Sequence, residues 1–202
     1  MKAVILISGN GSNLQSIIDN ADRIDLQISC VISNNKNAFG LERAESSNLR
    51  TAIVDSELYN SKEAFDRELI SIIQQQEVEL IVLAGYMRVL TPLFVSHYFG
   101  KILNIHPSLL PKFSGLNTHQ RAIDASEKVH GVSVHFVTKE LDGGPIINQE
   151  SVIIDNSDTE ETLSMKVLKK EHVIYPKAIH WYTQGRLKLI DKFTATLDGK
   201  II

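Results

Sequence analysis

The sequence predicts an α/β fold with a doubly wound, mostly parallel sheet, an antiparallel C-terminal part and a long C-terminal helix. Three observations support this prediction. In the first half of the chain, continuous apolar runs alternate with helical patterns, as in repeated βαβ units. After residue 127, apolar residues alternate with polar ones, as in antiparallel strands. A helical pattern then runs from residue 158 to about 184.

The five strands expected in the first half are short and apolar. Residues 3–7 (AVILI) form a continuous apolar run, which is typical of a strand buried on both faces of a parallel sheet. Four further strands are expected at residues 28–32, 51–54, 80–84 and 101–105.

Apolar residues at helical spacing separate these strands. Thr91 and Pro92 supply a capping residue and a proline at the first helical position, so a helix is expected to begin there. A short helix is expected over residues 39–44. Strand and helix in this order indicate right-handed βαβ units. The two longer helical faces consist of Leu14, Ile17, Ile18 and Ala21, and of Phe65, Leu69, Ile72 and Ile73.

The second half begins with two alternating runs. Val132, Val134 and Phe136 alternate with polar partners, and a second alternating run covers residues 146–154. The turn Asp142-Gly143-Gly144-Pro145 lies between the two runs. We therefore expect two further strands, at least one of them antiparallel.

The last part of the chain is predicted to be a helix followed by a hairpin. The helix of residues 158–184 has acidic residues in its first turn and Gly185 beyond its end. Pro176 lies inside it and is expected to bend it. Asp198-Gly199 is typical of a tight hairpin turn.

The composition is that of an ordinary globular protein with a small negative charge. The 202 residues are 43% hydrophobic and 22% charged, with 21 Lys and Arg against 24 Asp and Glu, for a net charge of −3. This balance offers no field for general nucleic-acid binding, although a local pocket can still bind a small anion. No repeat, low-complexity segment or linker divides the chain, so we expect one domain over residues 1–202.

Two observations indicate the compartment. The single Cys30 cannot form an internal disulfide, which matches a reducing environment. The N-terminal MKAVILISGN is too short for a signal peptide, and no run approaches the roughly 20 apolar residues of a membrane helix. We therefore expect a cytoplasmic protein without a membrane partner.

A glycine-containing loop, SGNGSN at residues 8–13, follows the first strand and precedes a helix. Glycines let the backbone approach a ligand, and the N–H groups at a helix start attract anions. The dinucleotide fingerprint fails, because Leu14 stands where the third glycine belongs and no acidic residue follows the second strand at Ser33-Asn34-Asn35. A single phosphate is the better interpretation; the alternative is a tight turn without a ligand.

Asn104 and His106 are the catalytic candidates, because they lie where the fifth strand ends. Residues two apart on a strand point to the same side, and Pro107 keeps His106 extended. An amide donor beside an imidazole suits the stabilisation of an oxyanion together with movement of a proton. Asp142 would hold one tautomer of His106 if it lay near, but sequence spacing cannot establish that pairing. The alternative is that these are structural polar residues and an ordinary turn.

The other candidate residues give weaker indications of catalysis or metal binding. Cys30 lies within an apolar run and is interpreted as an inert core thiol. The seven histidines show no metal-ligand spacing and no G-x-S-x-G motif occurs, so we expect no metal and no serine nucleophile. His135 faces either a second layer of the pocket or solvent. Lys169-Lys170 is interpreted as a solvated helix face.

Five segments carry a resemblance to a known family. They are ISGNGSNLQ at the first strand, AGYMRVL at 84–90, LNIHPSLLPKFSG at 103–115, SVHFVTKELDGGPII at 133–147 and EHVIYP at 171–176. In order and spacing, over nearly the whole chain, they closely resemble the phosphoribosylglycinamide formyltransferase family of folate-dependent enzymes in purine biosynthesis. The resemblance implies a Rossmann-like formyltransferase fold forming a single formyltransferase domain over residues 1–202. Residues 1–100 would form its phosphate- and ribonucleotide-binding half, and residues 101–202 its catalytic and folate-binding half.

The resemblance also implies roles for individual residues. Asn104, His106 and Asp142 match the catalytic residues of the family. The matches to the substrate-binding residues are Gly11, Ser12 and Asn13 for the phosphate and Glu171 for the glycinamide amine. The matches to the folate-binding residues are Lys62, Met87, Arg88, Val89, Leu90, Asn104, Thr138, Lys139, Glu140, Leu141 and Asp142. The chain departs from the family pattern at Phe113-Ser114, where Tyr-Pro is common, and at Asn117, where His is common.

The reaction implied by this resemblance is formyl transfer from 10-formyltetrahydrofolate, as co-substrate, to the amine of N1-(5-phospho-D-ribosyl)glycinamide. The products are the N2-formyl compound and tetrahydrofolate, in de novo purine (IMP) biosynthesis. Asn104 and His106 are expected to stabilise the oxyanion, and Asp142 to keep His106 protonated. We expect small-molecule partners only, no nucleic acid, and a monomer or a homodimer.

Several alternatives remain open at this point. A formyltetrahydrofolate hydrolase or a methionyl-tRNA formyltransferase would use the same scaffold, but these usually carry an extra N-terminal or C-terminal domain, respectively. The start of this chain at its first strand, without a basic C-terminal extension, favours the small-substrate transferase. A dinucleotide-binding oxidoreductase is disfavoured by the incomplete glycine fingerprint, and turnover would exclude a non-catalytic binding module.

Overall fold

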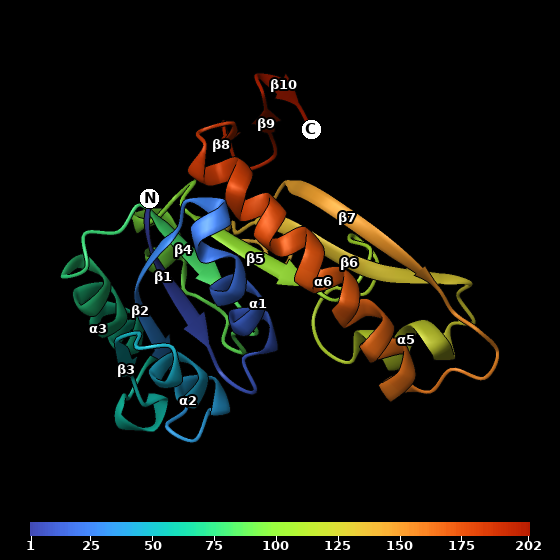
Figure 1. The fold of residues 1–202 in the computed structure, drawn as a ribbon, viewed down its shortest axis with the longest axis horizontal. Helices are drawn as coiled ribbons and strands as arrows, with labels where there is room; N and C mark the ends of the chain where they lie inside the picture. The colour runs from blue at the N-terminus through green and yellow to red at the C-terminus, as the bar shows by residue number, and fades with distance from the viewer. The chain divides into compact units, whose positions relative to one another are not determined.

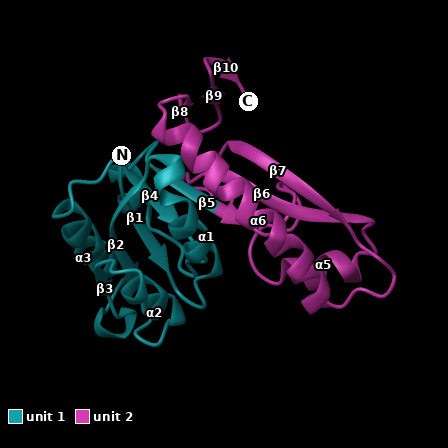
Figure 2. Cartoon of the chain, viewed as in Figure 1, with its two compact units in different colours: residues 1–104 teal, residues 105–202 magenta.

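The computed structural model describes residues 1–202, and the chain divides between Asn104 and Ile105 into two units. Unit 1 is Met1–Asn104 and unit 2 is Ile105–Ile202 (Figure 2). The division falls within a single strand, β5 (Ile102–His106). The assignment of residues 1–202 to one formyltransferase domain stays a prediction.

Unit 1 contains a parallel sheet whose strands lie in the order β3-β2-β1-β4-β5 (Figure 1). The chain runs outward from β1 to β3 and then returns to the other side of β1 as β4, so the sheet is doubly wound as predicted. The apolar run of residues 3–7 is completely buried in β1. The other strand bounds are β1 Lys2–Ile7, β2 Gln27–Ser33, β3 Thr51–Ile53 and β4 Leu80–Leu83.

Four helices connect these strands in two neighbouring pairs. Helix α1 packs beside α2, and α3 packs beside α4. Right-handed crossovers in this strand order put the two pairs on opposite faces of the sheet. Thr91 caps α4 as predicted, because its Oγ1 accepts a hydrogen bond from the Phe94 N–H at 3.4 Å. Pro92 is the first residue of the helix, also as predicted. The bounds are α1 Ser12–Asn20, α2 Phe39–Ser46, α3 Lys62–Gln74 and α4 Pro92–His97, with short 3₁₀ helices at Ala21–Ile24 and Ser56–Leu58.

Unit 2 contains the antiparallel part and the long helix. Strands β6 (Val129–Phe136) and β7 (Ile146–Ile153) pair antiparallel, and α6 (Glu160–Thr183) packs against both of them (Figure 1). The hairpin turn at Asp198-Gly199 is confirmed, with both residues at positive φ. The remaining elements are α5 Thr118–Asp124 and a small sheet of β8 Leu187–Leu189, β9 Ala195–Leu197 and β10 Lys200–Ile201.

Strand β6 is buried along almost its whole length, so the polar side chains of His130, Ser133 and His135 lie inside the protein. The Ser133 hydroxyl contacts the chain after β5, donating to the Ser108 carbonyl at 2.6 Å, so polar side chains of β6 have partners inside the protein. Helix α5 was not predicted, because only Thr118 and Ala122 of its residues are buried and no apolar periodicity marks it.

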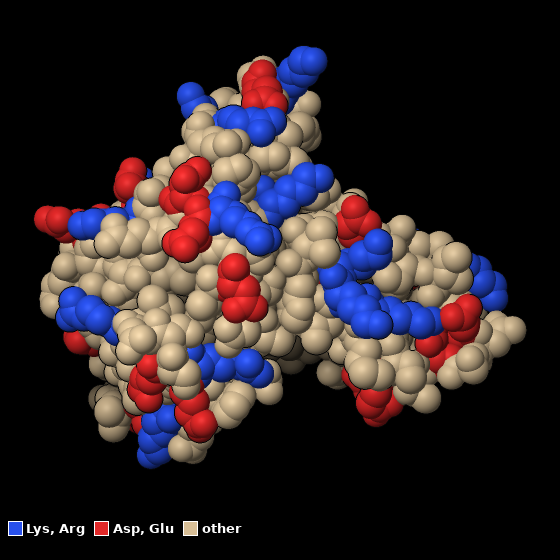
Figure 3. All heavy atoms as spheres, viewed as in Figure 1, with Lys and Arg blue, Asp and Glu red and all other residues tan.

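No helix is long and apolar enough to cross a membrane. On the face drawn in Figure 3, acidic and basic side chains are interspersed over each unit. This mixed pattern agrees with the small net charge of −3.

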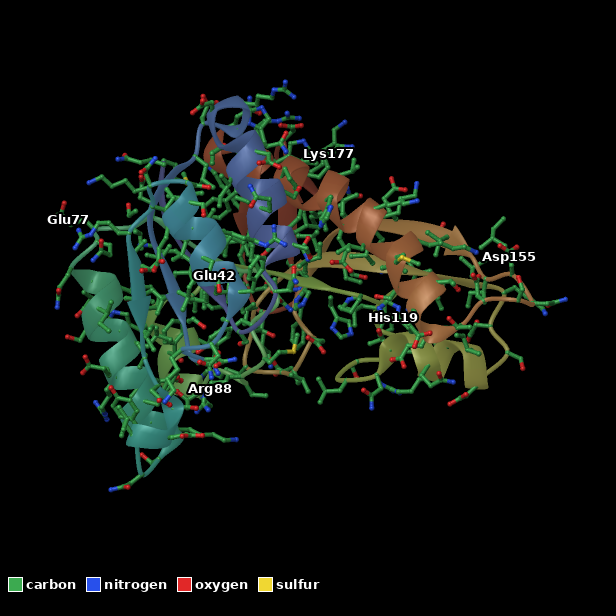
Figure 4. The ribbon with its side chains drawn as sticks, turned by 60° about the horizontal axis from the view of Figure 1, so that its bottom comes forward. Glu42, Glu77, Arg88, His119, Asp155 and Lys177 are labelled. Atoms are coloured by element: carbon green, nitrogen blue, oxygen red, sulfur yellow. The ribbon has the colours of Figure 1, made fainter.

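A half-buried histidine and a buried histidine contact each other in unit 2. The Nδ1 atom of His119, on α5 (labelled in Figure 4), lies 3.2 Å from Nε2 of His130 on β6. Burial, together with the neighbouring His119, lowers the pKa of His130 to about 4. Burial and the charge of His106 lower the pKa of His119 as well. Both rings are therefore neutral near pH 7.

We predict that the protein loses stability as the pH falls from about 6.5 to 4. The unfolded chain binds a proton at His130 in this range, whereas folded His130, with its pKa of about 4, does not. The free energy of unfolding should fall by on the order of 1 kcal/mol per pH unit, measured by urea denaturation. The variant His130→Gln should show a shallower pH dependence. An equal slope in both proteins would contradict the prediction.

Candidate active site

The carboxyl ends of β1 and β4 form the switch point of the doubly wound sheet, where such folds bind ligands. Ser8 connects the loops that begin there. Its N–H donates to the Gly85 carbonyl at 3.2 Å, and its hydroxyl oxygen accepts from the Met87 N–H at 2.7 Å. The same hydroxyl donates to Asn34 Oδ1 at 2.5 Å. One serine therefore holds the glycine loop, the end of β2 and the Met87 segment together.

The glycine loop of residues 8–13 leads directly into α1. Gly11 is the N-cap residue of this helix at φ +75°, with no side chain capping it. A Cβ at Gly11 would lie 2.7 Å from the Cα of Gly40, so both the backbone angle and the close approach of α2 require glycine. The loop thus presents a helix start of the kind that binds anions, at the sheet's switch point.

The segment after β4 combines exposed apolar side chains with an arginine that packs on an aromatic ring. Met87 and Val89 are 68% and 58% exposed, whereas Leu90 is buried. The Arg88 guanidinium lies 4.3 Å from the centre of the Phe65 ring (Arg88 is labelled in Figure 4). Lys62, the first residue of α3, is exposed. Exposed apolar side chains with a cation between them in the same segment suit an aromatic ligand with a carboxylate tail.

Strand β5 carries both Asn104 and His106, which is the arrangement that the sequence predicted. Side chains two residues apart on a strand point to the same side. Asn104 is half-buried and His106 is buried.

His106 lies between two acceptor oxygens within unit 2. Its Nδ1 is 3.5 Å from Oδ2 of Asp142, and its Nε2 is 2.9 Å from the backbone carbonyl oxygen of Phe113. The side chains of His106 and Asp142 are only 8% and 9% exposed. Oxygen acceptors at both ring nitrogens suit the doubly protonated imidazolium, and a buried carboxylate needs such a partner.

Asp142 is positioned by a turn and by a loop. It has φ +51° in the turn closed by the hydrogen bond from the Gly143 N–H to the Glu140 carbonyl at 3.2 Å. Its Oδ2 also accepts a hydrogen bond from the Gly115 N–H at 2.9 Å. The segment of residues 113–115 therefore contacts His106 with a carbonyl and Asp142 with an N–H.

The start of this loop is anchored on the β6–β7 pair. Ser133 accepts hydrogen bonds from the Leu110 N–H at 3.0 Å and from Gln149 Nε2 at 2.7 Å. Gln149 also donates to the Leu110 carbonyl at 3.0 Å. The Leu110-Pro111 peptide, whose isomer the sequence left open, is cis. The chain that leaves His106 is thus fixed at its start, and its contacts at 113–115 depend on that anchor.

His135, which the sequence left between pocket and solvent, is buried beside Asp142. Its Nε2 lies 3.8 Å from Oδ1 of Asp142, and its Nδ1 donates to the Phe136 carbonyl at 2.8 Å. Burial lowers the pKa of His135, so the ring is neutral and the nitrogen facing Asp142 carries no proton. A register shift between Val134 and His135 in the β6–β7 pair accompanies this placement.

The predicted folate segment of unit 2 precedes Asp142. Thr138 is buried, and its hydroxyl donates to Glu140 Oε2 at 3.1 Å. Hydrogen bonds from the Glu140 backbone and from Thr138 lower the pKa of Glu140. Leu141 is 58% exposed and Lys139 is exposed. Glu171 is buried within α6.

Sequence reasoning missed several contributors for a common reason. Ser8 is marked in the sequence only as part of the glycine loop, and its hydrogen bonds depend on its position directly after the end of β1. The Phe113 carbonyl and the Gly115 N–H are main-chain atoms, which no residue pattern marks. No group of three or more His, Cys, Asp and Glu side chains is arranged to hold a metal ion.

Comparison with known proteins gives a consistent result. The model of the formyl transferase family matches residues 1–179. The phosphoribosylglycinamide formyltransferase of Escherichia coli strain K12 is 50% identical over 202 residues, which cover 99% of this chain and 95% of the relative. The trifunctional purine biosynthetic protein adenosine-3 of Chironomus tentans is 42% identical over 93% of this chain, although this match spans only 14% of that longer protein.

A solved structure agrees with these relatives. The phosphoribosylglycinamide formyltransferase of Coxiella burnetii superimposes with a TM-score of 0.96 at 47% identity, covering 100% of this chain and 95% of that one. The predicted fold class is therefore confirmed by strand order, by the long helix and by this likeness. The chain belongs to the formyl transferase family, and within it to the phosphoribosylglycinamide formyltransferases.

Proposed function

We propose that the chain transfers the formyl group of 10-formyltetrahydrofolate to the amine of N1-(5-phospho-D-ribosyl)glycinamide, with Asn104, His106 and Asp142 as catalytic residues. The products are the N2-formyl compound and tetrahydrofolate, in de novo purine (IMP) biosynthesis. The observation that carries the proposal is the buried His106 ring with the Asp142 carboxylate at one nitrogen and an acceptor oxygen at the other.

The amine attacks the formyl carbon directly, and negative charge develops on the former formyl oxygen. His106 Nε2 donates to that oxygen and the Asn104 amide assists, while Asp142 stabilises the imidazolium. The Phe113 carbonyl oxygen lies 2.9 Å from Nε2, and we expect the formyl oxygen to take this position when substrate binds. This distance lies within the range of about 2.7–3.1 Å expected for oxyanion donors. The 113–115 segment must therefore release His106 when substrate binds.

The remaining step moves a proton. The attacking amine becomes acidic in the tetrahedral intermediate, and the folate nitrogen must gain a proton as it leaves. The transfer goes directly or through a water molecule, and the buried Asp142 carboxylate is a base that lies 3.5 Å from His106 Nδ1. No covalent intermediate with the enzyme is required.

The binding roles follow the chemistry of each segment. Backbone N–H groups of Gly11, Ser12 and Asn13 hold the substrate phosphate, and the Glu171 carboxylate receives the glycinamide amine. Exposed apolar side chains at Met87, Val89 and Leu141 suit the folate ring system. The other residues assigned to folate are Lys62, Arg88, Leu90, Asn104, Thr138, Lys139, Glu140 and Asp142.

We expect only small-molecule substrates, no nucleic-acid or membrane partner, and a cytoplasmic monomer or homodimer. The single Cys30 is buried and forms no disulfide, which suits a reducing compartment.

A turnover assay tests the reaction itself. We predict that protein, 10-formyltetrahydrofolate and the ribonucleotide together release tetrahydrofolate, followed by absorbance, with N2-formyl product detected by mass spectrometry. Omitting the ribonucleotide should abolish release. Equal release without the ribonucleotide would instead identify a formyltetrahydrofolate hydrolase.

Variants test the catalytic assignment. We predict that His106→Ala and Asp142→Ala each lower kcat by on the order of 10² to 10³, because each removes part of the charge stabilisation of the oxyanion. Circular dichroism should show that both variants are folded under the assay conditions, although the urea midpoint of His106→Ala should fall because the buried Asp142 carboxylate loses a partner. His97→Ala, at an exposed histidine of α4, is the matched control and should retain wild-type turnover. Near wild-type kcat in either His106→Ala or Asp142→Ala would refute the assignment.

A further inference from the structure

We propose that Arg43 is a positioning residue for the phosphate-binding loop, because it fixes the direction in which the Gly11 N–H points. Arg43 lies on α2 and is not among the residues assigned above to substrate or folate. The inference rests on the proposed function, since it requires that Gly11, Ser12 and Asn13 hold the phosphate of the ribonucleotide.

The guanidinium makes two hydrogen bonds to a single residue of the loop. Nε of Arg43 donates to the backbone carbonyl oxygen of Asn10 at 2.9 Å, and Nη2 donates to Asn10 Oδ1 at 3.1 Å. Two parallel donors on a rigid planar group hold both acceptors in a defined direction. Asn10 is therefore fixed through its main chain and its side chain together.

The main-chain bond determines the orientation of the next N–H. In a trans peptide the C=O and the following N–H point in opposite directions. Because the Asn10 carbonyl points at Arg43, the Gly11 N–H points away from Arg43. If this peptide turned over, a carbonyl oxygen would replace that N–H and repel a phosphate. Glycine at position 11 makes such a turn easy, since both halves of the φ range are open to it.

The preceding peptide is held by the same helix. The Gly40 N–H donates to the Gly9 carbonyl at 3.0 Å. A Cβ at Gly40 would lie 2.6 Å from Ile7 Cδ1 and 3.3 Å from the Gly9 carbonyl oxygen. The start of α2 can therefore approach the loop this closely only because residue 40 is glycine. Helix α2 lies beside α1, which is the helix that follows the loop (Figure 1). The first turns of α2 thus orient two consecutive peptides of the loop.

The Arg43 side chain is also held by a residue of its own helix. Its guanidinium lies 4.9 Å from the centre of the Phe39 ring, one helical turn earlier on α2. The side chain is therefore held between an aromatic ring and Asn10. A lysine would keep the charge but has no planar fork, so it cannot reproduce both bonds in this geometry.

Steady-state kinetics of Arg43→Lys and Arg43→Gln test the proposal. We expect the KM for the ribonucleotide to rise about tenfold in both variants, the loss typical of a charge-assisted hydrogen bond. The values of kcat and of the KM for 10-formyltetrahydrofolate should stay within about twofold of wild type. Arg23→Gln, at an exposed arginine after α1, is the matched control and should behave as wild type. Wild-type KM in Arg43→Lys would overturn the positioning role, because charge alone would then suffice.

A substrate without its phosphate separates positioning from general stability. Against the dephosphorylated ribosylglycinamide, wild type and both Arg43 variants should have equal kcat/KM, because no phosphate is there to be positioned. An equal loss with both substrates would overturn the proposal and identify a structural role only. If wild type itself does not distinguish the two substrates, the phosphate assignment of the loop fails. If wild type shows no formyl transfer, the proposed function fails, and this inference fails with it.

Discussion

The buried contact between the His106 ring and the Asp142 carboxyl is the constraint on which the arrangement of unit 2 depends. A carboxylate that is only 9% exposed requires compensating partners, and Asp142 has the His106 ring at 3.5 Å and the Gly115 N–H at 2.9 Å. His106 ends β5, whereas Asp142 lies in the connection between β6 and β7. The distance between them is therefore set by strand pairing and by the turn that holds Asp142 at positive φ.

The surrounding histidines make this pair electrostatically distinct. Burial lowers the pKa of His119, His130 and His135, so three imidazoles of unit 2 are neutral near pH 7. The His106 ring, whose Nδ1 lies 3.5 Å from Oδ2 of Asp142, is thus surrounded by neutral imidazoles. The cost is stability at low pH, because the neutral rings resist protonation only while the protein is folded.

Both units orient main-chain groups with side chains from neighbouring elements. In unit 1, Ser8 binds the Met87 N–H, and Arg43 binds the Asn10 carbonyl. In unit 2, Ser133 binds the Leu110 N–H at the start of the loop that reaches His106. Backbone donors have no alternative rotamers once their peptide plane is fixed, so they are well suited to recognising a phosphate or a charged intermediate. The side chains that fix those planes need not touch the ligand.

The order of the elements and the residue types available for chemistry can be predicted from local patterns in the sequence. The apolar run of residues 3–7, the Thr91-Pro92 helix start and the Asp198-Gly199 turn are local signals, and each was correct. Local periodicity could not reveal that β6 is buried on both faces, because that depends on what packs against it. The approach of Asp142 to His106 and of Arg43 to Asn10 likewise joins residues more than thirty positions apart. Only strand register, helix packing and turn geometry decide such pairings, since they fix distances that no sequence spacing encodes.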